Sequence, residues 1–439
     1  MDRVLFSAEE IGSLRIAAAG SPGEIVIATD VEPVSLLRAA APLFSQAQLV
    51  CHPDGTVLAG LGSAWSASGT GEDRFVGLTA KIESVAHAAT APIFAGFSFH
   101  SDGPHTAEWD GFHGIDAILP QVAVIATAMG RTLTLTKTAG LDLLGLIDVL
   151  AAVEEPGAVL PFEPGDHSVV SHPPSAHWRS EVEEALAAIA QGDLSKVVLS
   201  RSVVVTVDLE PSVFDLVDHL RDTYPQCYVF VWQTGDAAFV GASPELLLEK
   251  SGGSVRVNPL AGTARRGEGE ADDRAVGEAL MHSPKDREEH ALVVQDIAAR
   301  LGPVAIDLEI PAGPSLRRMA TVQHLSTEIV ARVDRSTPAL ELVDLLHPTP
   351  AVGGTPRETA VAFVEKIEGI DRGWYAGGIG WLTADGDATF AIPLRCALIR
   401  GRTALLYAGA GIVADSKPEA ELDETRLKFR PMLSLLTAT

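Results

Sequence analysis

"KVVLSRSVVVTV", residues 196–207, is a run of apolar and β-branched residues that predicts one long, buried strand. Because successive side chains of a strand point to opposite faces, Lys196, Val198, Ser200 and Ser202 share one face. A lysine at the end of such a strand usually extends its ammonium group into water along its apolar stem. The alternative is a buried amine that stays partly neutral and accepts a proton from water. Alone, the strand favours the solvent-exposed lysine.

Helical and strand patterns alternate after this point. An apolar stripe through Trp178, Val182, Ala185 and Ile189 predicts a helix that ends at Gly192. Further helices are predicted over residues 212–224, 286–302 and 423–436. Strands are predicted over residues 227–235, 237–250, 319–333, 373–386, 388–401 and 403–413. This mixed order predicts an α+β fold in which antiparallel sheets form the core and helices pack outside.

The N-terminal part of the chain has a different pattern. Residues 1–170 contain short apolar runs separated by Gly, Pro and Asp, which is typical of strands and hairpins. We therefore expect a mainly β N-terminal part, followed by a second part over residues 171–439. Residues 160–177 are rich in Pro, Gly and His and predict a long connection between the two. We expect both parts to share one core.

The composition limits the partners of the protein. Its 439 residues include 58 Asp and Glu against 33 Lys and Arg, a net charge of −25, which repels nucleic acid and anionic lipid. The N-terminus lacks the apolar run of a secretory signal, and the apolar stretches are too short to span a bilayer. Cys51, Cys227 and Cys396, odd in number and far apart, indicate reduced thiols in a cytoplasmic protein.

Two single residues are candidates for proton transfer or ligand binding. Glu245, in GASPELLLEK (241–250), precedes an apolar run, and burial there would raise the pKa of its carboxyl and suit a general acid. An exposed turn residue is the more common role for an isolated glutamate of this kind. His324 shares a strand face with Val322 and Ser326, and a lone histidine more often hydrogen-bonds within the core.

Two helical segments carry paired acidic residues. Asp286 and Glu289 are three residues apart, as are Glu421 and Glu424, so each pair shares a helix face. Lys428 lies one turn beyond the second pair. Two carboxylate pairs could hold a magnesium ion that keeps some of its waters and binds substrate oxygens. Two solvated helix faces are the competing explanation in so acidic a chain.

Other residues could bind a carboxylate group. Gly262 and Thr263, in NPLAGTARRG (258–267), offer a backbone amide and a hydroxyl donor. Arg395, predicted within a strand, could clamp a carboxylate through two parallel hydrogen bonds. In LLYAGAGIV (405–413), Tyr407 and Gly411 belong to a glycine-rich strand that a ligand can approach closely. The glycine spacing matches neither a phosphate-binding nor a dinucleotide-binding loop.

Taken in order, these segments resemble the chorismate-utilising enzyme family. The resemblance covers residues 175–436 and rests on KVVLSR, GASPELLL, NPLAGTARR, KDREEH, LHPTPAVGGTPR, IPLRCA and YAGAGIVADSKPEAELDETRLK. It implies the large fold of this family and chorismate as the substrate. Within the family the chain is most similar to isochorismate synthases, magnesium-dependent isomerases that add water to one ring carbon and expel a hydroxyl from another.

The resemblance also implies the catalytic pair and the branch of the family. Lys196 would activate the water, and Glu245 would protonate the departing hydroxyl. Branches that use ammonia usually carry glutamine in place of this lysine, and one of them often has a lysine at the position of Ala261. Salicylate synthases share the catalytic lysine but usually differ near Ala351, where HPTPAVGGTP favours isochorismate synthase.

The remaining roles follow from the same resemblance. Glu289 and Glu424 would bind magnesium, which in turn would hold the ring carboxylate. Asp286 and Glu421 would orient the waters of the metal. The residues implied in substrate binding are Gly262, Thr263, Arg395, Tyr407, Gly411 and Lys428 for the two carboxylates, and His324 and Ala351 for the ring.

Three functions stay open from the sequence. They are isochorismate synthase, salicylate synthase, which also eliminates pyruvate, and a catalytically silent chorismate-binding relative. The resemblance implies a monomer, and the acidic charge predicts that neither nucleic acid nor a membrane is a partner. An isochorismate product would feed menaquinone or siderophore biosynthesis.

Overall fold

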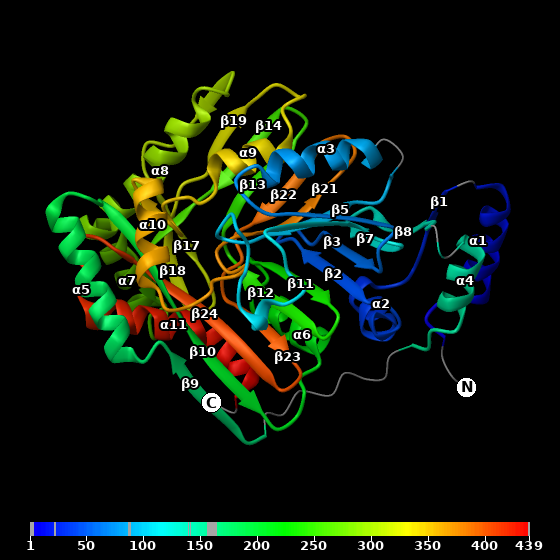
Figure 1. Ribbon diagram of the computed structural model, residues 1–439, viewed down its shortest axis with the longest axis horizontal. Helices are drawn as coiled ribbons and strands as arrows, with labels where there is room; N and C mark the ends of the chain where they lie inside the picture. Colours follow the sequence, from blue (N-terminus) through cyan, green and yellow to red (C-terminus); the bar gives the residue numbers. More distant parts are fainter. Residues whose placement is uncertain are drawn as a thin grey trace.

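The computed structural model of the protein describes residues 4–21, 23–86, 89–138, 140, 142–155 and 165–437. Within these ranges the strands form a twelve-stranded, a nine-stranded and a three-stranded sheet, all built from antiparallel pairs. Helices cover the outside of the sheets (Figure 1). The predicted α+β class, with antiparallel sheets in the core and helices outside, is confirmed.

The twelve-stranded sheet takes strands from both parts of the chain, which meet where β2 pairs with β11. Its order is β1 (Glu24–Ala28), β8 (Gly130–Thr136), β7 (Val122–Thr127), β3 (Val57–Leu61), β2 (Gln46–Cys51), β11 (Tyr228–Thr234), β12 (Ala237–Ser243), β23 (Cys396–Arg400), β24 (Thr403–Ile412), β10 (Lys196–Val207) and β20 (Gly354–Thr355). The strand β9 (His167–His172) also pairs with β10.

The nine-stranded sheet likewise joins both parts of the chain, through β5 and β21. Its order is β16 (Asp307–Glu309), β19 (Ile329–Arg332), β14 (Ser254–Asn258), β13 (Leu246–Ser251), β22 (Ala388–Ala391), β21 (Gly378–Leu382), β5 (Ile93–Phe97), β6 (Ile115–Leu119) and β4 (Trp65–Gly69). The small sheet contains β15 (Leu260–Arg265), β18 (Val322–Ser326) and β17 (Ser315–Arg318).

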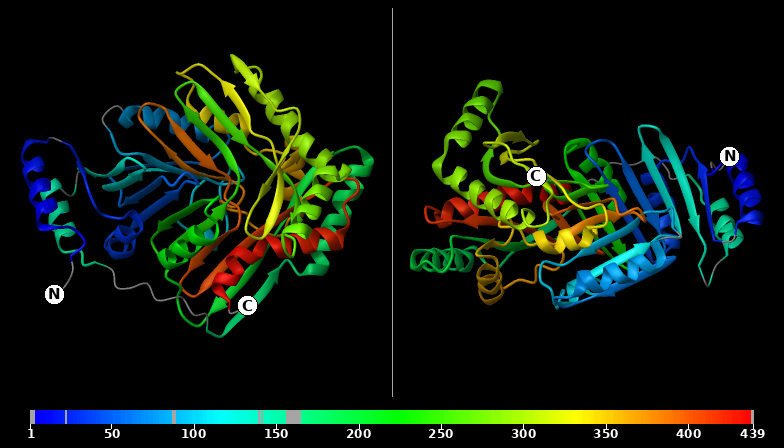
Figure 2. Two further views of the ribbon diagram at one scale, coloured as in Figure 1. Left: turned by 180° about the vertical axis from the view of Figure 1, so that it is seen from behind. Right: turned by 90° about the horizontal axis from the view of Figure 1, so that it is seen from above.

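Some of the helices lie at the two ends of the molecule and others lie between them (Figure 1). In Figure 1, α1 (Ala8–Gly20) and α4 (Leu143–Ala151) lie at one end, and α5 (Ser175–Gln191), α8 (Pro284–Leu301) and α10 (Arg357–Ile367) lie at the other. In Figure 2 the C-terminal helix α11 (Pro418–Leu436) runs across β24, which it contacts. The other helices are α2 (Pro33–Ala40), α3 (Arg74–Ala86), α6 (Val213–Thr223), α7 (Glu270–His282) and α9 (Ala339–Leu346).

The central strands are buried on both faces, which explains their continuous apolar sequence. In β11, Phe230 and Trp232 belong to one hydrophobic cluster, while Val229 and Val231 belong to another. The first cluster includes buried aromatic rings of the nine-stranded sheet, and the second includes apolar residues of α2 and α6. Because alternate side chains enter different cores, neither face of this strand can be polar.

The described parts of residues 1–170 contain four α-helices that were not predicted, so the prediction of strands and hairpins there is incomplete. Helix α1 has little difference in hydrophobicity between its faces, but Ser7 and Glu10 cap its first turn reciprocally. The side chain of Asp142 caps α4 by accepting a hydrogen bond from the backbone amide of Gly145 at 2.8 Å. Residues 160–164 of the predicted connection lie outside the described ranges, and its residues 167–172 form the strand β9.

Two further findings bear on the nature of the protein. In the described part of the chain, no helix is both long enough and apolar enough to cross a membrane. Cys51, Cys227 and Cys396 are buried and are not linked in disulfides.

Candidate active site

A cavity of about 50 Å³ lies where β10, β15, β18 and β24 meet the helices α8 and α11. Most of the residues singled out from the sequence line this cavity or lie directly behind its wall. Those that line it are Glu245, Gly262, Thr263, Glu289, His324, Ala351, Arg395, Gly411, Glu424 and Lys428.

Lys196 is fully buried at the first position of β10. Its Nζ lies 3.0 Å from Oε1 of Glu289, and its stem passes close to Gly411 on the neighbouring strand β24. The register that pairs Val198 with this glycine brings the lysine and the glycine to the same edge of the cavity. The solvent-exposed alternative for Lys196 is therefore wrong, because the amine is paired inside the protein.

Glu245 lies between β12 and β13, where the chain passes from the twelve-stranded to the nine-stranded sheet. Burial raises the pKa of its carboxyl to about 7, against the opposing effects of the Leu260 amide and the Lys196 charge. Its Oε1 has no hydrogen-bond partner within the described residues. A buried carboxyl with a free oxygen and a pKa near neutrality is suited to donate a proton, as the apolar run after it predicted.

Two carboxylates from different helices face the cavity, each beside a lysine. Glu289 of α8 pairs with Lys196, and Glu424 of α11 lies 2.5 Å from Nζ of Lys428. Burial raises the pKa of Glu289, but the adjacent ammonium of Lys196 outweighs burial and holds the pKa below its ordinary value. Nζ of Lys428 also donates to the carbonyl of Gly409 at 2.8 Å.

Asp286 and Glu421 lie behind these two carboxylates. Asp286 accepts a hydrogen bond from the hydroxyl of Ser283, and Glu421 accepts one from Nζ of Lys285 at 2.7 Å. Burial raises the pKa of both carboxyl groups, and neighbouring carboxylates raise it further. Lys285 was not predicted, although it directly precedes Asp286 in KDREEH.

The donor set suits a hard divalent cation that keeps part of its water shell. No group of three or more His, Cys, Asp and Glu side chains is arranged to hold a metal in the described part of the chain. Magnesium needs fewer protein ligands, because it is usually held by one or two carboxylates together with waters and substrate oxygens. Glu289 and Glu424 both face the cavity and meet this requirement.

His324 is held as a neutral ring at the cavity wall. Its Nδ1 lies 3.1 Å from the hydroxyl of Thr263 and 3.3 Å from the carbonyl oxygen of Gly262. Burial, followed by the charge of Arg395, lowers its pKa well below the ordinary value. A carbonyl can only accept, so Nδ1 carries the proton and Nε2, which has no partner among the described residues, remains an acceptor.

Arg395 does not lie in a strand, so that prediction is wrong. It occupies a bend before β23, with a φ of +50°, in the segment that passes back from the nine-stranded to the twelve-stranded sheet. Pro393 precedes it and cannot donate to a ladder, which ends regular pairing there. The amide of Ile392 donates to the carbonyl of Glu245 at 3.1 Å, so the two inter-sheet crossings are joined.

Tyr407 does not line the cavity, in contrast to its predicted role in substrate binding. It is buried behind Tyr375, whose ring stacks on it at 5.2 Å between centroids. Its hydroxyl accepts from Nε1 of Trp109 at 2.9 Å and donates to the carbonyl of Asp371 at 3.1 Å. Tyr375 lines the cavity instead. Its only sequence signal is an aromatic residue in GWYAGG, which also suits a core strand.

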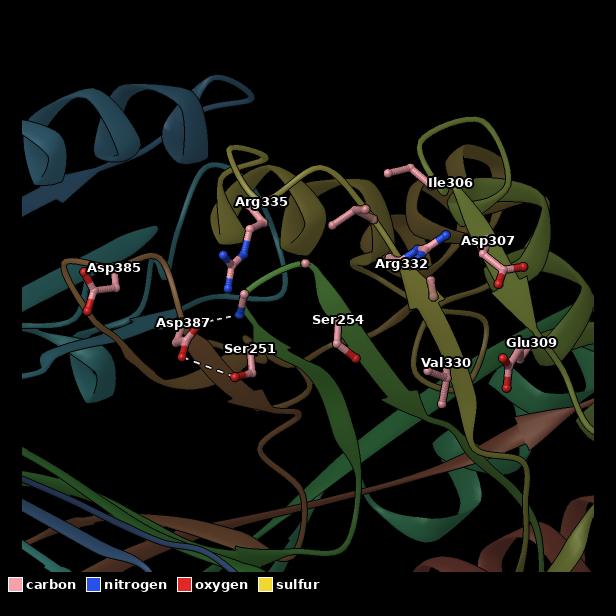
Figure 3. A pocket seen from close by; sticks show the side chains of 14 residues that line it. Ser251, Ser254, Ile306, Asp307, Glu309, Val330, Arg332, Arg335, Asp385 and Asp387 are labelled. Atoms are coloured by element: carbon pink, nitrogen blue, oxygen red, sulfur yellow. Dashed lines mark hydrogen bonds between the residues drawn. The ribbon is translucent and has the colours of Figure 1, made fainter.

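A larger cavity of about 1260 Å³ lies elsewhere, at the edge of the nine-stranded sheet (Figure 3). Ser254, Arg332, Arg335 and Asp387 are among its lining residues, and Asp387 hydrogen-bonds to the Ser251 hydroxyl. All the predicted site residues are described, and none of them lines this cavity. The volume of a cavity is therefore a poor guide to the active site of this protein. The small cavity is the better candidate, because buried acidic and basic side chains converge on it.

Comparison with known proteins shows the family of the chain. Residues 24–437 match the family described as chorismate binding enzyme. The chain belongs to this family. Isochorismate synthase MenF of Bacillus subtilis is 37% identical over 360 residues, which are 81% of this chain and 76% of that protein.

Two other members of the chorismate-binding family support the assignment. The salicylate biosynthesis isochorismate synthase of Pseudomonas aeruginosa is 36% identical over 392 residues, covering 86% of this chain and 82% of that protein. The crystal structure of MenF, the menaquinone-specific isochorismate synthase of Escherichia coli, superimposes with a TM-score of 0.83 at 26% identity. It covers 97% of this chain and 99% of that chain.

Proposed function

We propose that this protein is a magnesium-dependent isochorismate synthase. The observation that carries the proposal is the burial of an acid and a base beside one small cavity: Glu245 lines it, and the buried Lys196 pairs with Glu289, which also lines it. Relatives named isochorismate synthase that match most of this chain support the same reaction. The enzyme is an isomerase, because the reaction takes up one water and releases one water. The substrate and the product therefore have the same composition.

The two catalytic residues divide the proton transfers. Lys196 acts as the base: after its ammonium group has released a proton, the neutral amine takes a proton from a water molecule as the water oxygen bonds to one ring carbon. Glu245 gives its proton to the hydroxyl that leaves another ring carbon, and the ring double bonds shift between the two. An acid and a base are both required, because water is a weak nucleophile and hydroxide a poor leaving group.

The substrate carboxylates need cationic and hydrogen-bonding partners in an acidic protein. Arg395 and Lys428 supply positive charge at the cavity wall, and the amides and hydroxyl near Thr263 supply donors. The neutral His324 presents Nε2 as an acceptor for a ring hydroxyl. Ala351, also at the wall, leaves room for the flat ring.

Glu289 and Glu424 would hold magnesium, with Asp286 and Glu421 behind them. When bound, the metal supplies positive charge that neutralises the ring carboxylate. Lys196 and Lys428, which pair with these glutamates, would then share the carboxylate oxygens with the metal.

The test is to incubate the protein with chorismate and magnesium and to separate the products by chromatography. We expect isochorismate as the product. Salicylate together with pyruvate would instead assign the salicylate synthase reaction, and absence of any turnover would contradict the proposal. A Lys196→Gln variant run in parallel excludes a contaminating enzyme.

The setting of the reaction is also part of the proposal. Three buried free cysteines support the reducing cytoplasm as the location. We expect the enzyme to act as a monomer, and its product to supply menaquinone or siderophore biosynthesis.

A further inference from the structure

Glu368 and Arg372 form a buried ion pair next to the cavity that none of the roles above uses. The exposed fractions of their side chains are 2% and 0%, and Nε of Arg372 donates to Oε2 of Glu368 at 2.7 Å. Glu368 directly follows α10, and Arg372 lies in the loop that leads to β21. The ring of Phe99 covers the guanidinium, 4.2 Å from its centre.

The other donors of the guanidinium reach two walls of the catalytic cavity. Nη1 of Arg372 donates to the carbonyl of Val352 at 2.9 Å, and Nη2 donates to the carbonyl of Val198 at 2.7 Å. Val198 and Val352 both line the cavity. The carboxylate of Glu368 adds a third bond to the backbone, because its Oε1 accepts from the amide of Ser200 at 2.6 Å.

Burying this ion pair costs desolvation free energy, so we expect the geometry that it imposes to serve a function. The free energy lost when two charges leave water often cancels the gain from their attraction. Apolar side chains at these two positions could therefore stabilise the fold equally well. A planar guanidinium fixes four directed bonds at once, which a leucine or a lysine cannot do. Val198 and Ser200 are two and four residues beyond Lys196 on β10, so their bonds hold the strand that carries the catalytic amine.

We propose that the Glu368–Arg372 pair is a positioning device for catalysis. It sets the separation between the start of β10, which carries Lys196, and the loop that carries Ala351 and Val352. Neither side chain touches the substrate. This inference rests on the proposed function, since the amine that it positions is the base of that reaction.

The test uses two conservative variants of the pair in the full chain. Arg372→Lys keeps the charge, so Glu368 is not left unpaired, but it loses the fork that joins Val198 to Val352. Glu368→Asp keeps the charge but shortens the reach to the Ser200 amide. For each we expect kcat for isochorismate formation to fall at least about tenfold, while KM changes by less than about threefold.

A second readout does not depend on activity. Amide hydrogen exchange in both variants should become faster in residues 196–201 and 351–355, and should stay unchanged in α2 and α6. The matched control is Arg38→Lys, because Arg38 links these two helices by bonding to Asp215 at 2.9 Å and to Asp218, far from the cavity. We expect this control to lower Tm without lowering kcat.

The outcomes separate this inference from the proposed function. If the folded pair variants keep kcat within twofold of the wild type, or if Arg38→Lys lowers kcat as much, the positioning role is refuted. Unchanged exchange in residues 196–201 refutes it as well. A wild-type protein that makes no isochorismate refutes the proposed function, and hydrogen exchange still decides whether the pair holds β10.

Discussion

Gly411 and Glu289 lie so close together that a β-carbon on the glycine would be 2.3 Å from Oε1 of the glutamate. The same β-carbon would be 3.0 Å from Cε of Lys196. The absence of a side chain at this position therefore leaves the space in which Lys196 meets Glu289.

Gly411→Ala should accordingly displace the Lys196–Glu289 pair. We expect kcat to fall about 100-fold, because a shift of about 1 Å in a catalytic group has an effect of that size. Steady-state kinetics with chorismate measures this loss. Gly77→Ala is the control, since a β-carbon at Gly77 in α3 meets no atom within 4 Å. Equal kcat values for the two variants would contradict the steric role of Gly411.

Lys196→Gln should abolish the addition of water and leave chorismate binding largely intact. Loss of a general base lowers kcat by about 10²–10⁴-fold. Lys250→Gln provides a matched control, because Lys250 is also buried and its Nζ donates to the carbonyls of Arg335 and Gly386. The control should unfold at a lower temperature and keep its kcat. Near-wild-type activity of the Lys196→Gln variant would show that Lys196 is not the general base.

Glu424→Gln should weaken the dependence on magnesium. A neutral amide is a poorer ligand for a hard cation, so we expect the magnesium concentration for half-maximal activity to rise at least about tenfold. Glu419→Gln alters an exposed glutamate of the same helix, whose carboxylate pairs with Arg179, and should leave the titration unchanged. A magnesium titration of Glu424→Gln that matches the wild type would show that this residue does not bind the metal.

The pKa of Glu245, raised to about 7 by burial, predicts the pH dependence of the reaction. A general acid must be protonated, so kcat/KM should fall as the pH rises above about 7, by about tenfold for each further pH unit. Profiles from pH 5.5 to 9 at constant magnesium and ionic strength test this. In the Glu245→Gln variant, the kcat/KM of the residual activity should not fall above pH 7. A wild-type profile that is flat from pH 6 to 9 would argue against Glu245 as the acid.

Glu181 offers a test of stability away from the reacting groups. Burial, and then the charge of Glu368, raise its pKa to about 7 from the ordinary 4.5. The native state then holds a proton that the unfolded state has released, so the free energy of unfolding falls as the pH rises from about 4.5 to 7.

Glu181→Gln removes this titration. Above pH 7 we expect it to raise the free energy of unfolding by about 1–3 kcal/mol relative to the wild type, and near pH 4 to change it little. Urea unfolding at both pH values measures the difference. Glu184→Gln, at an exposed position of α5, should show no such pH dependence. A Glu181→Gln variant that is less stable than wild type at pH 8 would contradict the raised pKa.

The strands and helices that pack against a clear core were predictable from the sequence. The run at 196–207 and the helix that ends at Gly192 appear in the structure as β10 and α5. The segment at 319–333 was predicted as one strand, but it forms β18 and β19 in two different sheets. Local periodicity could not reveal this change of sheet, because only Thr327 and Glu328 separate the two strands.

The site was predictable as a set of residues, but its tertiary pairing was not. The i, i+4 spacing within one helix already places Lys428 beside Glu424, whereas the pairing of Glu289 with Lys196 depends on how β10 approaches α8. The same holds for Arg372, whose partners Val198 and Val352 are distant in sequence. Backbone carbonyls carry no residue-specific signal, so a side chain that binds them cannot be found from motifs.

The pairing of β2 with β11 has a practical consequence for handling the protein. A fragment that begins at residue 171 would retain every residue of the catalytic cavity, but it would lose β2 and leave one edge of YVFVWQT (228–234) unpaired. An exposed apolar strand edge of this kind promotes intermolecular association. The fragment would also lose Trp109, the hydrogen-bond partner of Tyr407. Expressed alone, the fragment should accumulate as insoluble aggregates. The first 170 residues therefore keep the rest of the chain soluble by covering this strand edge.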